Sequence, residues 1–133
     1  MIENKGCTAN VVLIKDGFLY VANAGDARCV AAIGGKAVAL SNDHKPTLSR
    51  EKQRVIKAGF SVNQEGRIDG NLNLSRAIGD LRYKKNKKLK QHEQAISAYP
   101  EVKSIAYQGG AGKQRVDFLV MGCDGIWELK NSQ

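Results

Sequence analysis

The chain has 133 residues, of which 42% are hydrophobic and 26% are charged, as in an ordinary globular domain with one core. No apolar run approaches the roughly 20 residues that a membrane-spanning helix needs, so no association with a membrane is expected. The first residues show neither the apolar stretch of a signal peptide nor the arginine- and serine-rich pattern of a transit peptide. We therefore expect the protein in the cytoplasm, the nucleus or both.

The net charge of +8 comes from 21 lysines and arginines against 13 acidic residues, and part of the excess is local. Six basic residues lie between Arg82 and Lys90. Such a run either binds the phosphates of a nucleic acid or forms a solvated loop. Tyr83 is its one aromatic residue, so the run lacks the interleaved rings that stack on bases. The solvated loop is favoured, and no nucleic-acid partner is expected.

Three cysteines indicate the redox environment. Cys7, Cys29 and Cys123 are odd in number and far apart, and each lies within an apolar stretch. This spacing matches neither a disulfide framework nor a zinc site. We expect three reduced thiols, each of them buried.

Residues 8–40 alternate short apolar runs with turn signals, which predicts antiparallel strands. The runs are rich in β-branched and aromatic residues, and this favours strands over a buried helix. Lys15–Gly17 predicts a hairpin turn because Gly17 can adopt a positive φ. The predicted strands are Thr8–Ile14, Phe18–Ala24, Ala27–Ile33 and Ala37–Leu40.

One helix is predicted at Ser49–Ala58, with Thr47 or Ser49 as the residue that caps its first turn. Gly59 is suited to end the helix in the left-handed conformation, and Phe60 then packs back on the helix. The apolar stripe is narrow, since it consists of Val55 and Ala58 with Leu48 and Ile56 as further candidates. The helix is therefore expected to cover a surface.

The second half of the chain begins with glycine- and asparagine-rich sequence at Ser61–Asp80, which predicts irregular strands and a loop that lies over the core. Residues 100–107 and 114–123 predict two more strands, joined by a surface connection at Gln108–Lys113. The run Phe118–Cys123 is almost wholly apolar and is expected to be a buried strand. A helix is expected to start at Asp124.

Asp26 and Asp124 share an unusual setting, because each follows an apolar strand and lies next to a glycine. A buried carboxylate needs donors, a cation or a proton. If the two acids came within ~4 Å of each other, they would repel by about 4 kcal/mol at a dielectric of about 20, and a divalent cation would reverse that cost. Oxygen ligands favour Mg²⁺ or Mn²⁺. The alternative is that each aspartate caps a turn or a helix.

Six blocks in order resemble the type 2C protein phosphatases, which are metal-dependent Ser/Thr phosphatases: GCTANVVLI, LYVANAGDAR, LSNDHKP, GNLNLSRAIGD, YPEV and FLVMGCDGIWE. The resemblance runs from about Gly6 to Asn131. It implies an α+β fold, an antiparallel β-sandwich with flanking helices. Residues 1–133 would form the central and rear part of one such domain, with a flap-like segment at about residues 44–80.

The resemblance also implies a chemistry, in which a water bound by two Mg²⁺ or Mn²⁺ ions attacks phosphoserine or phosphothreonine in a protein. Asp124 matches the acid that acts as a metal ligand and catalytic residue. Asp26 matches an acid that helps to hold a third, weaker metal ion, and Glu128 stands where many members have an aspartate that contributes to the same ion. Glu128 lies four residues after Asp124, on the same face of a helix that starts there.

Two residues of the flap-like segment are candidates for further roles. Arg76 either binds substrate phosphate or forms an internal ion pair with Asp80 or another acid. His44 is expected to form hydrogen bonds within its loop. The family's histidine block does not occur in this sequence, so no residue here is assigned as general acid.

The blocks that would supply the remaining metal ligands are also not found in the sequence. We therefore expect weak metal binding and little or no activity from these residues alone. The alternative function is a non-catalytic, phosphatase-like binding or regulatory module. The strands left with open edges suggest a homodimer formed through edge pairing.

Overall fold

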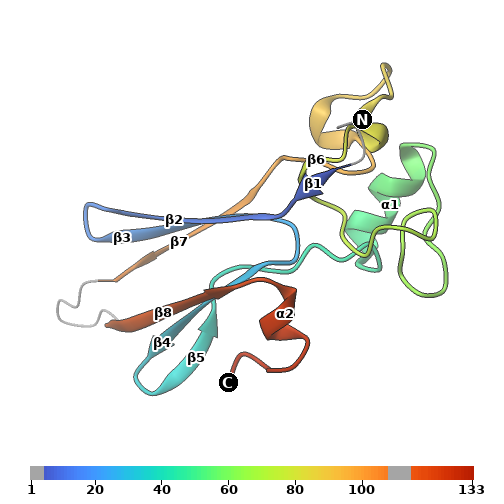
Figure 1. Ribbon diagram of the computed structural model, residues 1–133. Helices are drawn as coiled ribbons and strands as arrows, with labels where there is room; N and C mark the ends of the chain where they lie inside the picture. The colour runs from blue at the N-terminus through green and yellow to red at the C-terminus, as the bar shows by residue number, and fades with distance from the viewer. Residues whose placement is uncertain (1–4, 108–114) are drawn as a thin grey trace. The chain divides into compact units, whose positions relative to one another are not determined.

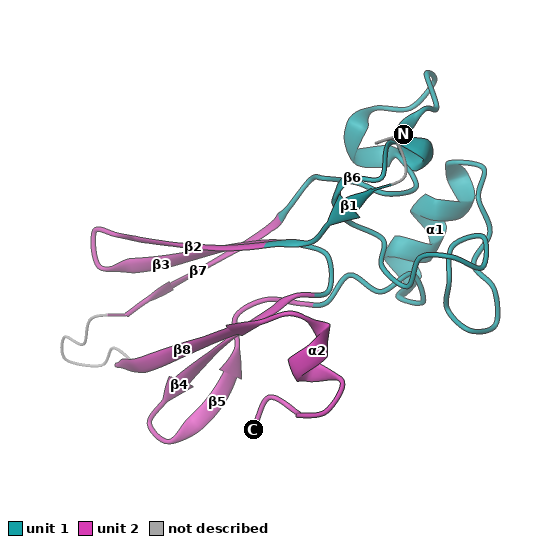
Figure 2. Ribbon diagram, in the orientation of Figure 1, with its two compact units in different colours: residues 1–9, 24–26, 43–100 teal, residues 10–23, 27–42, 101–133 magenta. Residues whose placement is uncertain are grey.

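A computed structural model describes residues 5–107 and 115–133 of the chain. The chain divides into two compact units, shown in Figure 2. The first consists of residues 1–9, 24–26 and 43–100, and the second of residues 10–23, 27–42 and 101–133. No helix within the described residues is long and apolar enough to cross a membrane. The predicted connection Gln108–Lys113 lies outside the described residues.

The second unit is built from two three-stranded sheets, and the strands can be followed in Figure 1. The first sheet has the order β2 (Ala9–Lys15), β3 (Phe18–Ala24), β7 (Glu101–Ala106), and the second has the order β5 (Lys36–Ala39), β4 (Arg28–Ile33), β8 (Val116–Gly122). In the first sheet β3 and β7 are antiparallel, with Phe18 opposite Ala106, and in the second sheet β4 and β8 are antiparallel, with Arg28 opposite Gly122.

The core of the second unit draws on both sheets, which confirms the predicted β-sandwich. Leu19 and Val21 of β3 pack in one cluster with Cys29 and Ala31 of β4. The two residues of each pair are two positions apart, so their side chains lie on the same face of the strand. Partly buried side chains of the other strands, among them Val12, Ile105 and Leu119, extend the cluster.

The hairpin between β2 and β3 has the turn chemistry that the sequence predicts. Asp16 and Gly17 have φ angles of 49° and 78°. Positive φ at both turn residues matches the right-handed twist of the flanking strands, and Asp-Gly is a preferred pair at such positions. The β3 strand has the predicted bounds, and the other predicted strands are found with ends shifted by one or two residues.

The first unit contains the longer helix and several short elements around a second core. Helix α1 (Ser49–Lys57) packs its Val55 and the following Ala58 into this core. The short elements of the first unit are the paired strands β1 (Gly6–Cys7) and β6 (Ile78–Gly79) and the 3-10 turns η1 (Leu81–Lys84) and η2 (Gln91–Glu93). The second unit contains one short helix, α2 (Asp124–Trp127), among its described residues.

The end of α1 confirms the prediction and its start corrects it. Gly59 has a φ of 94°, its N–H donates to the Ile56 carbonyl at 2.9 Å, and the Phe60 N–H donates to the Val55 carbonyl at 3.2 Å. These two bonds satisfy carbonyls of the last turn. The N-cap, however, is Leu48, which makes no side-chain capping bond, so the expected cap at Thr47 or Ser49 is wrong.

Several burial predictions are also wrong. Residues 61–80 do not merely lie over the core, because Ile68 and Ala77 are fully buried in the core cluster of the first unit. Cys29 is buried but Cys7 and Cys123 are exposed. Strand β8 is not a buried strand: Phe118 is 62% exposed, since β8 is the edge of its sheet and one of its faces is open.

A buried carboxylate connects the segments of the first unit. Glu51 of α1 accepts hydrogen bonds from the Arg76 guanidinium at 2.7 Å and 3.1 Å, from the Ser75 hydroxyl at 2.6 Å and from Arg54 at 2.6 Å. Arg54 also donates to the Gln94 carbonyl at 3.0 Å, and Arg76 donates to a further backbone carbonyl. Two arginines thus anchor three chain segments on one acid.

The pKa of Glu51 reports how strongly the carboxylate is held. Burial by itself would raise this pKa, but hydrogen bonds from Arg76 and Ser75 and the charge of Arg54 outweigh burial and lower the pKa from 4.5 to about 2. Burial has the opposite consequence for Arg54, whose pKa is lowered, with Arg76 and Arg50 adding repulsion. Glu51 and Arg54 therefore depend on each other for their charged states.

We predict that Glu51→Gln lowers the free energy of unfolding by about 3 kcal/mol, because two guanidinium groups lose the charge that compensates their burial. Urea unfolding followed by circular dichroism measures the change. Glu65→Gln, at an exposed position, removes the same charge and is the matched control. Equal effects of the two substitutions would contradict a special role of Glu51.

The same network predicts a pH dependence. A carboxyl whose pKa is depressed in the folded state stabilises the fold above its unfolded pKa and loses that contribution as pH falls. We therefore expect the parent chain to lose on the order of 3 kcal/mol between pH 4.5 and about 2. The Glu51→Gln variant should lack this component in urea titrations across that range.

Candidate functional site

Asp26, one of the two predicted metal ligands, lies in the first unit and is 3% exposed. Its carboxylate forms a short ion pair with the ammonium group of Lys45, whose side chain is 36% exposed. A buried carboxylate needs a compensating charge, and the described residues supply it from inside the protein. Lys45 was not singled out in the sequence, although it immediately follows His44 in the NDHKP block.

The backbone around Asp26 is fixed by its neighbours. The His44 N–H donates to the Gly25 carbonyl at 3.0 Å, and the Gly25 N–H donates to His44 Nδ1 at 3.2 Å. Gly25 has a φ of 122°, and a Cβ there would lie 2.4 Å from the Thr8 side chain. Glycine is therefore required at this position. His44 forms hydrogen bonds as predicted, but its partner Gly25 lies in the connection between β3 and β4 and not in the loop of His44 itself.

Asp124 and Glu128, the other two predicted ligands, lie in the second unit and are both exposed. Asp124 is the first residue of α2, its side chain accepts a hydrogen bond from the Gly125 N–H at 2.9 Å, and its carbonyl accepts one from the Glu128 N–H at 2.8 Å. One helical turn thus separates the two acids. The expected start of a helix at this aspartate is confirmed.

Trp127 anchors this turn to the sheet below it. Its indole N–H donates to the Gly122 carbonyl of β8 at 2.8 Å, and the Arg28 guanidinium of β4 lies 5.2 Å from the centre of its ring. Arg28 also donates to the Ser132 hydroxyl at 3.0 Å. These contacts fix the direction in which the chain leaves β8. They therefore also fix the position of Asp124, the first residue of helix α2.

The three acids have the right chemistry for a hard divalent cation but do not form a complete set of ligands. Within residues 5–107 and 115–133 no group of three or more His, Cys, Asp or Glu side chains is placed to hold a metal ion. Mg²⁺ and Mn²⁺ need several oxygen ligands to compete with water. The convergence of Asp26 and Asp124 on one ion stays a prediction.

Arg76 forms the internal ion pair that was one of its two expected roles. Its partner is Glu51, and the side chain is 7% exposed. Asp80, the acid named in the prediction, lies close to Lys84 instead; burial raises its pKa, and the charge of Lys84 partly offsets this. Binding of substrate phosphate by Arg76 stays a prediction, and the ion pair accounts for its position.

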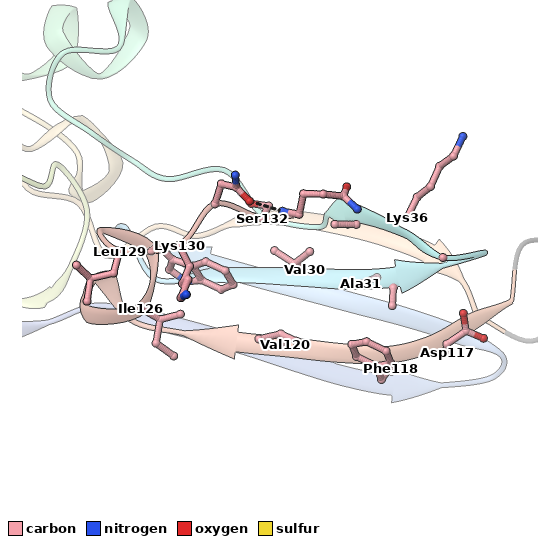
Figure 3. Close-up of a pocket in the computed structure, with 16 residues that line it drawn as sticks. Val30, Ala31, Lys36, Asp117, Phe118, Val120, Ile126, Leu129, Lys130 and Ser132 are labelled. Carbon is pink, nitrogen blue, oxygen red and sulfur yellow. Dashed lines mark hydrogen bonds between the residues drawn. The ribbon is translucent and has the colours of Figure 1, made fainter.

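A cavity of about 620 Å³ in the second unit, shown in Figure 3, lies over the sheet that contains β4, β5 and β8. Val30 of β4 and Phe118 and Val120 of β8 form part of its wall, and Ile126 and Leu129 close one end. These side chains are apolar, and none of the three candidate ligands lines the cavity. Lys36, Asp117 and Lys130 also line the cavity, so its wall is not wholly apolar.

Comparison with known proteins gives a consistent family. The model of the protein phosphatase 2C family matches residues 1–133. Probable protein phosphatase 2C 21 of Arabidopsis thaliana is 50% identical over 128 residues, which are 96% of this chain and 34% of the plant protein. Protein phosphatase 1G of Rattus norvegicus is 48% identical over 131 residues, which are 98% of this chain and 23% of the rat protein.

A solved structure agrees with these relatives. A phosphatase from Toxoplasma gondii superposes with a TM-score of 0.71 at 35% sequence identity, over 84% of this chain and 33% of that chain. The antiparallel sandwich with few helices is an α+β fold of the phosphatase type, as predicted. The chain belongs to the protein phosphatase 2C family. It spans about a third of the length of the plant relative.

We predict that Lys45→Met lowers the free energy of unfolding by about 2 kcal/mol, because it leaves the buried Asp26 carboxylate without its cation. Urea unfolding measures the effect, and Asp26→Asn in the Lys45→Met background should restore part of it. Lys15→Met is the control, since Lys15 lies 3.9 Å from the exposed Asp16 and should contribute almost nothing. A Lys45 effect as small as that of the control would contradict the prediction.

Proposed function

We propose that these residues are the central and rear part of a Mg²⁺- or Mn²⁺-dependent phosphatase domain that hydrolyses phosphoserine and phosphothreonine in proteins. Family membership supports the reaction class. The observation that carries the proposal is Asp124, an exposed carboxylate at the tip of β8 whose backbone is fixed by the Trp127 anchor. Its partner substrates are phosphoproteins, and the cytoplasm or nucleus remains the proposed location.

The assignment of individual ligands rests on the blocks that the chain shares with the phosphatase family. We propose Asp124 as a ligand of the principal metal pair and Asp26 with Glu128 as ligands of a weaker third ion.

The second candidate function is a non-catalytic, phosphatase-like binding module. The observation that favours it is the lack of a cluster of three metal-binding side chains in the described part of the chain. A related proposal is a homodimer formed through edge pairing. It is supported by β8, an edge strand of its three-stranded sheet, because an edge strand presents unpaired backbone N–H and C=O groups.

We predict weak binding of Mn²⁺ by the 133-residue chain, with a dissociation constant on the order of millimolar, since two or three carboxylates compete poorly with water. Isothermal titration calorimetry measures the affinity, and Asp124→Ala should weaken it further. A micromolar dissociation constant would show that this chain alone completes a metal site.

The catalytic proposal is tested in a chimera, in which this chain replaces the matching third of the Arabidopsis relative. We expect Mn²⁺-dependent hydrolysis of a phosphothreonine peptide that EDTA abolishes. Asp124→Ala in the chimera should lower kcat by about a hundredfold or more, because a metal ligand acts directly on the reacting atoms.

Asp117→Ala is the matched control, because it removes an exposed aspartate of the same strand β8. This variant should keep the activity of the chimera. A folded chimera without turnover, or one in which both alanine variants behave alike, would favour the binding module.

A further inference from the structure

A second cavity lies in the first unit, beside helix α1, and contains none of the candidate metal ligands. Its volume is about 350 Å³. One wall is a single stripe of α1, formed by Arg50, Gln53, Arg54 and Lys57. Residues spaced by three and four positions lie on the same face of a helix, so the cations of this stripe face the cavity together. The opposite wall contains Arg76, His92, Glu93, Ser97 and Tyr99.

The charges in the walls do not balance. Four cations line the cavity, and Glu93 is the one carboxylate among the lining residues. Lys57 donates to Glu93 at 2.9 Å, and this hydrogen bond is the main reason that the pKa of Glu93 is lowered. Glu51 lies behind the wall and serves the two buried arginines. Arg50 makes no ion pair with any residue that the structure describes.

Like charges at these helical spacings repel each other and destabilise the helix. Arg50 and Arg54 are four positions apart, and Arg54 and Lys57 are three. Burial is the main cause that lowers the pKa of Arg54, and Glu51 opposes this effect. The charges of Arg76 and Arg50 lower the pKa further, which shows that the cations of the cavity wall repel one another. An anion in the cavity would relieve this repulsion.

The shape of the cavity favours a peptide over a nucleic acid. Tyr99 is 65% exposed, and its ring centre lies 5.8 Å from that of His92 with the two ring planes inclined at 57°, which places an exposed aromatic side chain next to the cations. A nucleic acid gains affinity from many phosphates along its length. This cavity has a volume of about 350 Å³, which suits a few side chains of a peptide better than a continuous phosphate backbone.

We propose that the cavity beside α1 is a docking site for an acidic peptide segment of a partner protein. One side-chain anion of the peptide lies among Arg50, Arg54 and Lys57, and a neighbouring side chain packs against Tyr99. This site goes beyond the phosphatase reaction, because it requires no metal ion and none of the three candidate ligands.

The test uses the 133-residue chain in EDTA, so that it does not depend on catalysis. Fluorescence anisotropy of a labelled peptide of alternating glutamate and glycine measures binding at low ionic strength. Arg50→Glu should weaken binding about tenfold, because a favourable charge in the site becomes a repulsive one. Lys52→Glu is the matched control: it makes the same change of charge in the same turn of α1 but on a residue outside the cavity.

Two further measurements separate docking from general charge attraction. Tyr99→Ala leaves the charge unchanged and should still weaken binding several-fold. A peptide with phosphoserine in place of one glutamate distinguishes the source of the anion, and binding of either peptide supports the site. Circular dichroism of each variant confirms that it is folded.

Three results would overturn the proposal. Equal losses for Arg50→Glu and Lys52→Glu would mean that only net charge matters. Full displacement of the peptide by an equal concentration of inorganic phosphate would mean a site for small anions. Tighter binding of a single-stranded oligonucleotide of the same charge, weakened by the same substitutions, would mean a nucleic-acid site.

Discussion

The first unit depends on one carboxylate. Glu51 accepts hydrogen bonds from Ser75, Arg54 and Arg76, and the two arginines reach on to backbone carbonyls of residues 94–99. Three of the seven described residues that are buried in the apolar core of this unit are alanines. The irregular segments of this unit are ordered by their polar contacts with Glu51. The position of Glu51 is itself fixed because the residue is buried on helix α1. The wall of the cavity beside α1 includes Arg54 and Arg76, and hydrogen bonds to Glu51 hold both side chains in place.

A similar arrangement fixes Asp26. Its position follows from Gly25, which only glycine can occupy, and from the hydrogen bonds between Gly25 and His44. Lys45 then brings an ammonium group to the buried carboxylate. If Asp26 binds a divalent cation in a complete domain, that ion and Lys45 compete for the same oxygens. The affinity for the ion then equals the attraction of the Asp26 carboxylate for the ion minus its attraction for the Lys45 ammonium group. Lys45 therefore lowers the affinity for the ion.

The sequence predicted the parts of the structure that have a local or periodic signature. The strands of the sandwich follow from alternation, the hairpin from Asp16-Gly17, and the end of α1 from Gly59. The role of Glu51 has no such signature, because acids on a short charged helix are usually solvated and two of its partners, Ser75 and Arg76, lie more than twenty residues away. The burial of Ile68 could not be predicted either, since burial depends on which irregular segments cover one another. The three candidate ligands were predicted from their blocks, while Lys45 was missed because an ion pair between loops has no periodicity.

The unequal burial of the cysteines gives the molecule internal reporters. Cys123 is accessible next to the candidate ligand Asp124, whereas Cys29 lies between the sheets, where burial raises the pKa of its thiol. Only the thiolate reacts with alkylating reagents, so Cys29 is protected twice while the sandwich is closed. Its rate of alkylation therefore measures how often the two sheets separate, and the exposed cysteines provide the reference rate within the same chain.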